Sequence, residues 1–261
     1  MKFDKAYIIS WQGRRDIAPA RLSLLARVVE WCVSKDLEPI IIAMEWQPSD
    51  FVPFSGVTTI EVPMRLPPAH ARNIALNVFY ASDDDYTVIL DDDTWIAEGD
   101  DIVDTLRELN HPGLELLSVL DQGEEEVHFK PSKNHHLTPI SRIVSGVFIF
   151  KNLRKYEKGE LFFNTGFTTV AGDRHDLMYG EDVNIVHRAL VRGLDTHMVK
   201  SSMTNSSRNK RKHPSTWMQN ITWAEMEPYG TKQSYVGQMA YKEFGTIPTP
   251  IGNPFILRKP E

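Results

Sequence analysis

The residues with the clearest chemical potential are three consecutive aspartates, Asp91, Asp92 and Asp93. They follow Tyr86-Thr-Val-Ile-Leu, whose β-branched and apolar character predicts a short buried strand. Adjacent carboxylates repel one another, so they are best tolerated in water or around a cation. At the carboxyl end of a strand, where open α/β sheets bind ligands, they suit a hard divalent ion that also accepts phosphate oxygens. The motif alone is equally compatible with a solvated acidic turn.

Two further segments carry groups that could act together with the aspartates. Arg72 lies near the start of an expected helix, where it could pair with a phosphate or hydrogen-bond a ribose, or simply face solvent. Glu181 and Asp182 open an amphipathic helical pattern that ends at Gly193. Acids at a helix start complement the macrodipole, but in a cleft a carboxylate there could also act as a general base towards a hydroxyl.

Strands and helices that would position these groups alternate along the first 120 residues. This alternation predicts an α/β fold: a GT-A-like (Rossmann-like), mostly parallel sheet flanked by helices on both faces, with a less regular, mixed second half. Expected strands cover 6–10, 39–44, 57–62, 86–90, 114–120, 143–150 and 194–200. Expected helices are one through Leu22 to Cys32 with Asp16 and Pro19 in its first turn, one over 69–81, and one from Gly99 to Leu109. The polar stretch 121–138 is expected to be a mobile excursion. We expect one catalytic domain over residues 1–200 and a C-terminal extension, 201–261, packed on it.

Composition narrows the possible classes of protein. The 261 residues are 41% hydrophobic and 25% charged, as in an ordinary globular protein. Cys32 is the single cysteine, which excludes an intramolecular disulfide and a multi-cysteine zinc site. The net charge of −6 argues against nucleic-acid binding by the whole surface, although not by a local patch. Without a long apolar stretch, we expect a soluble, cytoplasmic protein. Dinucleotide, P-loop and H-E-x-x-H motifs do not occur in the sequence.

Taken in order, these motifs resemble the GT-A fold of nucleotide-sugar-dependent glycosyltransferases over residues 5 to 200. The resemblance implies a "DxD" motif, with Asp91 near the ribose and Asp93 on a Mn²⁺ or Mg²⁺ ion that bridges the donor diphosphate. The donor would be a nucleoside-diphosphate sugar, with a UDP-sugar as our expectation. The residues that this resemblance places against the nucleotide sugar are Arg14, Arg15, Arg72, Asp91, Asp92, Ser145 and Gly146.

The same resemblance assigns roles to residues in the second half of the chain. Glu181 and Asp182 look like the family's "ED" acids on the acceptor side, with Asp182 as the catalytic base and Glu181 as the second candidate. A base opposite the leaving group would invert the anomeric configuration, and retention stays open. Many members add a metal-binding histidine after the following strand. His197 falls inside that expected strand, so His213 is the next candidate for a metal ligand, with water or a diphosphate oxygen as the alternative.

A basic and aromatic segment after residue 200 bears on which acceptor the protein would bind. Its members are Arg208, Lys210, Arg211, Lys212 and Trp217. Such a segment suits a nucleic-acid backbone and a stacked or flipped base, a lid over the donor diphosphate, or a solvated loop. With the small size, it resembles phage enzymes that glycosylate hydroxymethylated pyrimidines in DNA. That resemblance implies double-stranded DNA as the partner, and a phage-encoded protein in the host cytoplasm.

Three other functions remain compatible with the sequence. A glycosyltransferase acting on a polysaccharide or lipid-linked glycan would share the donor site and differ only in its acceptor. Asp91-Asp-Asp-Thr also resembles the D-x-D-x-[TV] motif of haloacid-dehalogenase-type (HAD-like) phosphatases, although its threonine comes one residue early and its strand is the fourth instead of the first. The third is a non-catalytic nucleic-acid-binding protein, against which the acidic centre argues.

Overall fold

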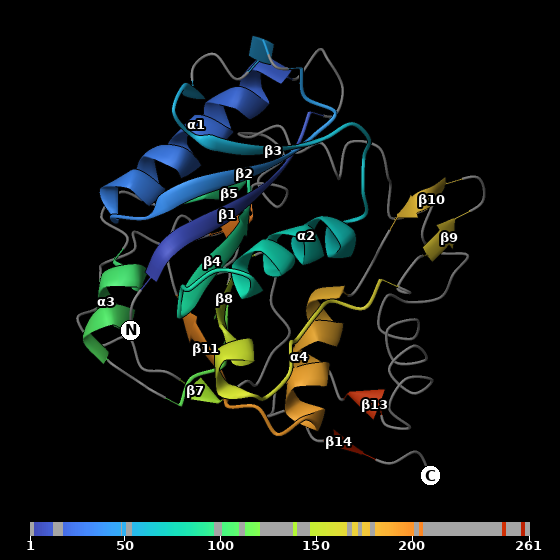
Figure 1. The fold of residues 1–261 in the computed structure, drawn as a ribbon. Helices are drawn as coiled ribbons and strands as arrows, with labels where there is room; N and C mark the ends of the chain where they lie inside the picture. The colour runs from blue at the N-terminus through green and yellow to red at the C-terminus, as the bar shows by residue number, and fades with distance from the viewer. Residues whose placement is uncertain are drawn as a thin grey trace.

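The computed structural model describes residues 3–12, 18–47, 49–50, 54–96, 101–109, 113–120, 138–139, 147–165, 169–171, 174–177, 181–200, 204–205, 247–248 and 257–258. Within them, the chain forms an eight-stranded sheet in the order β3-β2-β1-β4-β8-β6-β11-β7 (Figure 1). Its strands are β1 (Phe3–Trp11), β2 (Glu38–Met44), β3 (Thr58–Val62), β4 (Tyr86–Asp91), β6 (Leu116–Leu120), β7 (Thr138–Pro139), β8 (Phe148–Lys151) and β11 (Thr196–Lys200).

The sheet is mostly parallel, as the sequence predicts. Strand β1 pairs in parallel with β2 and β4, β2 with β3, and β6 with β11. Strand β8 is antiparallel to both β4 and β6, and β7 is antiparallel to β11. The mixed pairings therefore belong to the second half of the chain, where the alternation of strand and helix is less regular.

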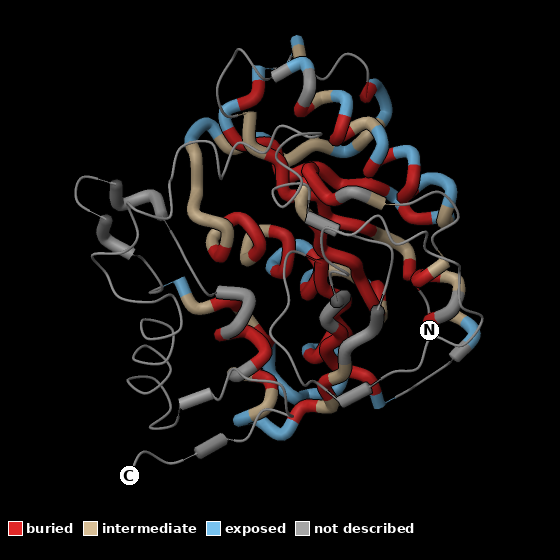
Figure 2. The backbone as a smooth tube through the Cα atoms, turned by 180° about the vertical axis from the view of Figure 1, so that it is seen from behind, coloured by how far each residue is buried: buried red, intermediate tan, exposed pale blue. Residues whose placement is uncertain are grey.

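Helices cover both faces of this sheet (Figure 1). One face packs against α1 (Ala18–Ser34) and α3 (Ile102–Leu109), and the other against α2 (Pro68–Tyr80) and α4 (Glu181–Val191). Residues of β4 alternate between the faces: Val88 and Leu90 join the α1 core, whereas Ile89 joins the α2 core. Figure 2 shows the buried positions running along the central strands. No helix among the described residues is long and apolar enough to cross a membrane.

Local sequence signals explain where α2 begins and where α4 ends. Pro67 is the N-cap of α2, as the Pro-Pro pair predicts, because proline suits the first positions of a helix. Gly193 follows α4 with φ of 67°, a conformation that glycine adopts without steric penalty. The strand expected over 143–150 is found at Phe148–Lys151, and residues 140–146 lie outside the described residues. The expected excursion over 121–138 also lies outside them, except for Thr138 in β7.

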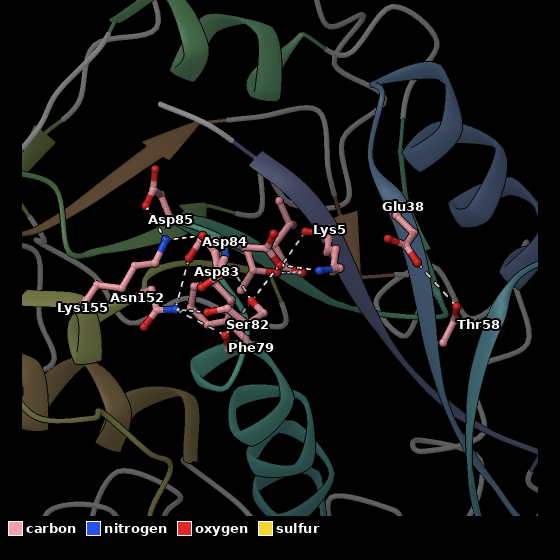
Figure 3. Close-up of polar contacts among 12 residues, drawn as sticks. Lys5, Glu38, Thr58, Phe79, Ser82, Asp83, Asp84, Asp85, Asn152 and Lys155 are labelled. Carbon is pink, nitrogen blue, oxygen red and sulfur yellow. Dashed lines mark hydrogen bonds and ion pairs between the residues drawn. The ribbon is translucent and has the colours of Figure 1, made fainter.

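The turn between α2 and β4 is held by a buried polar network (Figure 3). Asn152, which is fully buried, donates from its amide nitrogen to the carbonyls of Phe79, Ser82 and Asp84 at 3.3, 3.2 and 3.1 Å. Lys5 donates to the carboxylate of Asp84 at 2.8 Å. Because the turn joins α2 directly to β4, this network determines how the two elements lie relative to each other.

Several short elements complete the described structure. They are a 3₁₀ helix (Leu153–Tyr156), β5 (Thr94–Trp95), β9 (Thr169–Ala171), β10 (Arg174–Leu177), β12 (Thr204–Asn205), β13 (Ile247–Pro248) and β14 (Leu257–Arg258). Strand β12 pairs with β5, and β5 begins immediately after Asp93. The beginning of the C-terminal segment therefore lies beside the aspartates, a contact that only the tertiary structure reveals.

Candidate active site at the acidic turn

Asp91, Asp92 and Asp93, here called the acidic turn, lie at the carboxyl end of β4 in the middle of the sheet. Asp91 is the last residue of β4, and the backbone N–H of Asp92 donates to the carbonyl of Ile9 on β1 at 3.0 Å. The prediction that the aspartates end a buried strand is confirmed. The alternative of a solvated turn is wrong for Asp92 and Asp93, which are only 1% and 7% exposed.

Asp91 points to the α2 side of the sheet and pairs with Arg72. Nη2 of Arg72 lies 3.0 and 3.1 Å from the two carboxylate oxygens. The Arg72 guanidinium is also within 6 Å of the ring centroids of Phe148 and Phe163, at 5.9 and 5.6 Å. Arg72 is only 3% exposed, so it is not the solvated helix arginine that the sequence also allowed. Burial raises the pKa of Asp91, and the charge of Arg72 opposes that rise.

Asp92 points to the α1 side, where it is enclosed by protein groups. Arg21 of α1 forms a short ion pair with Oδ1, and the hydroxyl of Ser10 donates to Oδ2 at 2.6 Å. The indole N–H of Trp46 donates in turn to Ser10 Oγ at 2.9 Å. Burial and repulsion from Asp93 raise the pKa of Asp92 against the opposing charge of Arg21. This enclosure argues against the expected direct contact between Asp92 and a nucleotide sugar.

Sequence reasoning missed Arg21, although the sequence contains a signal for it. Arg21 has the same helical spacing as Leu25, Val28 and Cys32, all of which are fully buried. A single arginine on the apolar side of a helix requires an acidic partner, since a buried unpaired charge is strongly unfavourable. The acidic turn supplies that partner.

Asp93 completes the turn and decides whether a metal ion fits. Its Oδ2 lies 3.4 Å from Nη1 of Arg21, and its side chain is 9% exposed, compared with 23% for Asp91. Three carboxylates and two guanidiniums leave a formal charge of −1, which suits a divalent cation. Within the described residues, no cluster of three or more His, Cys, Asp or Glu side chains could hold a metal. Asp91 and Asp93 therefore fit a partial shell, to be completed by water or phosphate oxygens.

A second polar group, which we call the edge cluster, lies where β1, β2 and β3 end. Its members are Trp11, Glu45 and Arg65. The Trp11 indole N–H donates to Glu45 at 2.7 Å, and the Arg65 guanidinium lies 3.8 Å from the centroid of the Trp11 ring. Ile9 pairs with Asp91, and Trp11 lies two residues further along the same strand. The edge cluster is thus on the strand next to the acidic turn, and its Glu45 and Arg65 were not predicted.

The remaining predicted site residues are only partly described. Helix α4 begins at Glu181, so Glu181 and Asp182 occupy its first two positions, on the same face of the sheet as α2 and Arg72. His197 is the second residue of β11, within the expected strand, and its Nδ1 lies 3.1 Å from Oδ1 of Asp195. Outside the described residues lie Arg14, Arg15, Ser145, Gly146, Arg208, Lys210, Arg211, Lys212, His213 and Trp217.

Comparisons with known proteins agree with this architecture. No protein-family model matches the chain, and no curated protein matches its sequence. TarS residues 1–349 from S. aureus superimposes with a TM-score of 0.50 at 11% identity, covering 94% of this chain and 72% of TarS. Mannosyltransferase PcManGT from Pyrobaculum calidifontis, solved with GDP-Man and Mn²⁺, has a TM-score of 0.49 at 14% identity. The match covers 95% of this chain and 77% of PcManGT.

These likenesses are structural and concern the fold alone. The chain has the mostly parallel, Rossmann-like (GT-A-like) α/β architecture that its sequence predicts. The acidic turn lies at the carboxyl ends of the parallel strands, where open α/β folds bind their ligands.

Proposed function

We propose that this protein is a metal-dependent glycosyltransferase that moves a sugar from a nucleoside-diphosphate sugar to a hydroxyl acceptor. The proposal depends above all on one observation: Asp91 and Asp93 lie at the carboxyl end of β4 beside the buried Arg72. Carboxylates suit a divalent cation, and an arginine suits a phosphate. A donor diphosphate that arrives with its metal ion would require both kinds of group in one place.

The edge cluster supports a place for the nucleoside. The Arg65 guanidinium covers one face of the Trp11 ring, and the Glu45 carboxylate offers acceptors for N–H or O–H groups of a base or ribose. Because β1 lies next to β4, a nucleoside at the edge cluster would place its diphosphate towards Asp91 and Asp93. We propose a UDP-sugar as the donor, with Arg14 and Arg15 after β1, and Ser145 and Gly146 before β8, as further contacts.

The chemical step is assigned to the first two residues of α4. The Asp182 carboxylate, with Glu181 as second candidate, takes the proton of the acceptor hydroxyl. The acceptor oxygen then bonds to the anomeric carbon, the bond from that carbon to the diphosphate oxygen breaks, and nucleoside diphosphate leaves. A Mn²⁺ or Mg²⁺ ion held by Asp91 and Asp93 would act as a Lewis acid that stabilises this leaving group. His213, water or a diphosphate oxygen would complete its shell.

For the acceptor we propose a hydroxymethylated pyrimidine in double-stranded DNA. Support comes from the basic and aromatic segment between Arg208 and Trp217, which follows β12 in sequence. Since β12 pairs with β5, Asn205, three residues before Arg208, lies beside Thr94 at the end of the acidic turn. A polysaccharide or lipid-linked glycan is the alternative acceptor, and it would leave the donor site unchanged.

The experiment is nucleoside-diphosphate release from a panel of nucleotide sugars with Mn²⁺. It is run without acceptor, with plain DNA, and with DNA that carries 5-hydroxymethylated pyrimidines. Asp93→Asn should abolish release. Asp85→Asn is the matched control, because Asp85 precedes β4 at the opposite end of the strand and pairs with Lys155. It should leave release unchanged.

Each result separates two functions. Release stimulated only by the modified DNA supports both donor and acceptor, whereas slow release that ignores DNA supports a glycan or lipid acceptor. Hydrolysis of a phosphomonoester without a sugar donor would contradict glycosyl transfer and favour the phosphatase. Pyrophosphate release from a nucleoside triphosphate and a sugar phosphate would instead indicate nucleotidyl transfer.

A further inference from the structure

The two arginines beside the acidic turn come from opposite faces of the sheet. Arg72, from α2, reaches Asp91, whereas Arg21, from α1, reaches Asp92 and Asp93. This division follows from the positions of the helices, because α2 and α1 cover opposite faces of the sheet. Both arginines are buried, Arg72 at 3% and Arg21 at 4% exposure, and Arg21 approaches the turn from the α1 side.

Arg21 is one member of a continuous buried chain of hydrogen bonds. The chain runs from Trp46 to Ser10, from Ser10 to Asp92, and from Arg21 to Asp92. Ser10 is fully buried and Asp92 is 1% exposed, so Asp92 is fixed inside the protein. Nε and Nη1 of Arg21 are buried with no hydrogen-bond partner among the described residues. Nη1 is nevertheless 3.4 Å from Asp93, the carboxylate within its reach.

We propose that Arg21 is a positioning residue for the metal-binding carboxylates. It holds Asp92 inward as an anchor and, through Nη1, fixes the orientation of the Asp93 carboxylate. Arg21 itself touches neither metal nor substrate. The inference rests on the proposed function, because it concerns the metal site of the same transferase. Groups that orient metal ligands from behind typically change metal affinity by about 10- to 100-fold when they are removed.

A purely electrostatic role for Arg21 predicts the opposite change in Mn²⁺ affinity when Arg21 is removed. A positive charge behind the site repels a cation, so removal of that charge alone would tighten Mn²⁺ binding. Loss of positioning would weaken the binding, because Asp93 would no longer be held and Asp92 would lose its partner. The direction of the change in Mn²⁺ affinity therefore separates the two roles.

The test measures Mn²⁺ binding to the whole protein without any donor, from the electron paramagnetic resonance signal of free Mn²⁺. Arg21→Met should weaken binding by about tenfold or more. Arg21→Lys keeps the charge but loses the planar fork, so it should fall between Met and the wild type. Lys35→Met is the matched control: it removes one positive charge directly after α1 and one ion pair with Asp104, and should leave affinity unchanged.

Arg21→Met could unfold the protein by leaving Asp92 buried without its partner. The double variant Arg21→Met with Asp92→Asn removes both charges, so it should restore folding while Mn²⁺ binding stays weak. Unchanged or tighter binding in either folded variant would overturn the inference. A wild type that binds Mn²⁺ but releases no nucleoside diphosphate from any donor would contradict the proposed function alone. A wild type that does not bind Mn²⁺ at all would overturn both.

Discussion

Replacing Asn152 by alanine should destabilise the protein by an amount that follows from its hydrogen bonds. The Asn152 side chain donates to the carbonyls of Phe79, Ser82 and Asp84. Phe79 keeps two other donors, the backbone N–H and the hydroxyl of Ser82, both within 3 Å. The carbonyls of Ser82 and Asp84 lose the Asn152 donor, at about 1 to 1.5 kcal/mol each. The expected loss of unfolding free energy is therefore about 2 to 3 kcal/mol.

Equilibrium urea denaturation measures this loss directly. With a slope of about 2 to 3 kcal/mol/M, the midpoint should fall by about 1 M while the slope stays constant. Asn152→Asp keeps the size of the side chain but turns a carboxylate towards the same carbonyls, so at pH 7 it should destabilise at least as much as alanine. Asn77→Ala, at an exposed asparagine of α2, is the control and should change stability by less than about 0.5 kcal/mol. An equally small effect of Asn152→Ala would refute the reasoning.

Two further predictions concern charge. Burial alone would raise the pKa of Asp84, but hydrogen bonds from Lys5 and Ser82 outweigh it and hold that pKa below its ordinary 3.8. The stability that this lowered pKa provides is present above pH 3.8 and is lost as pH falls through the folded pKa. Lys5→Met should therefore destabilise the protein at neutral pH, and the loss should shrink below about pH 3.8. Denaturation measured at a series of pH values checks this. A difference that does not change with pH would contradict this. Because Arg21 and Arg72 already compensate two of the three carboxylates, calorimetry in excess EDTA should still show one cooperative unfolding transition, and added Mn²⁺ should raise its midpoint. Loss of that transition in EDTA would show that the metal is part of the fold.

The fold could be predicted from the sequence because its signals are local. The strand ending at Asp91 is short, apolar and followed by charge, and the prolines before Ala69 fix the start of α2. Strand and helix alternate with short connections, which leaves a parallel sheet as the simplest arrangement. Two-residue strands such as β5 and β12 carry no such signal, since their pairing depends on residues more than 100 positions apart in the chain.

The candidate site was only partly predictable, because its partners come from distant elements. Arg72 could be associated with the aspartates by its place before their strand, but its contact with Phe163 depends on a segment about 90 residues further along. Asn73 of α2 holds that segment through two hydrogen bonds of 2.9 Å to the backbone of Phe163. Glu45 and Arg65 follow different strands, and nothing in their local sequence associates them with Trp11.

Ion pairs with two arginines explain how the fold tolerates three adjacent, mutually repelling aspartates. One cation could not pair with all three, because Asp91 faces Arg72 on the α2 side, whereas Asp92 faces Ser10 and Arg21 on the α1 side. The sheet edge separates them, and each finds an arginine on its own side. Asp92 is thereby withdrawn from ligand chemistry, and the remaining carboxylates keep a net charge low enough for a buried site and negative enough for a divalent ion. A lone arginine on the apolar side of the first helix, such as Arg21, therefore indicates an acidic partner elsewhere in the fold, and the end of an acidic strand is a candidate for that partner.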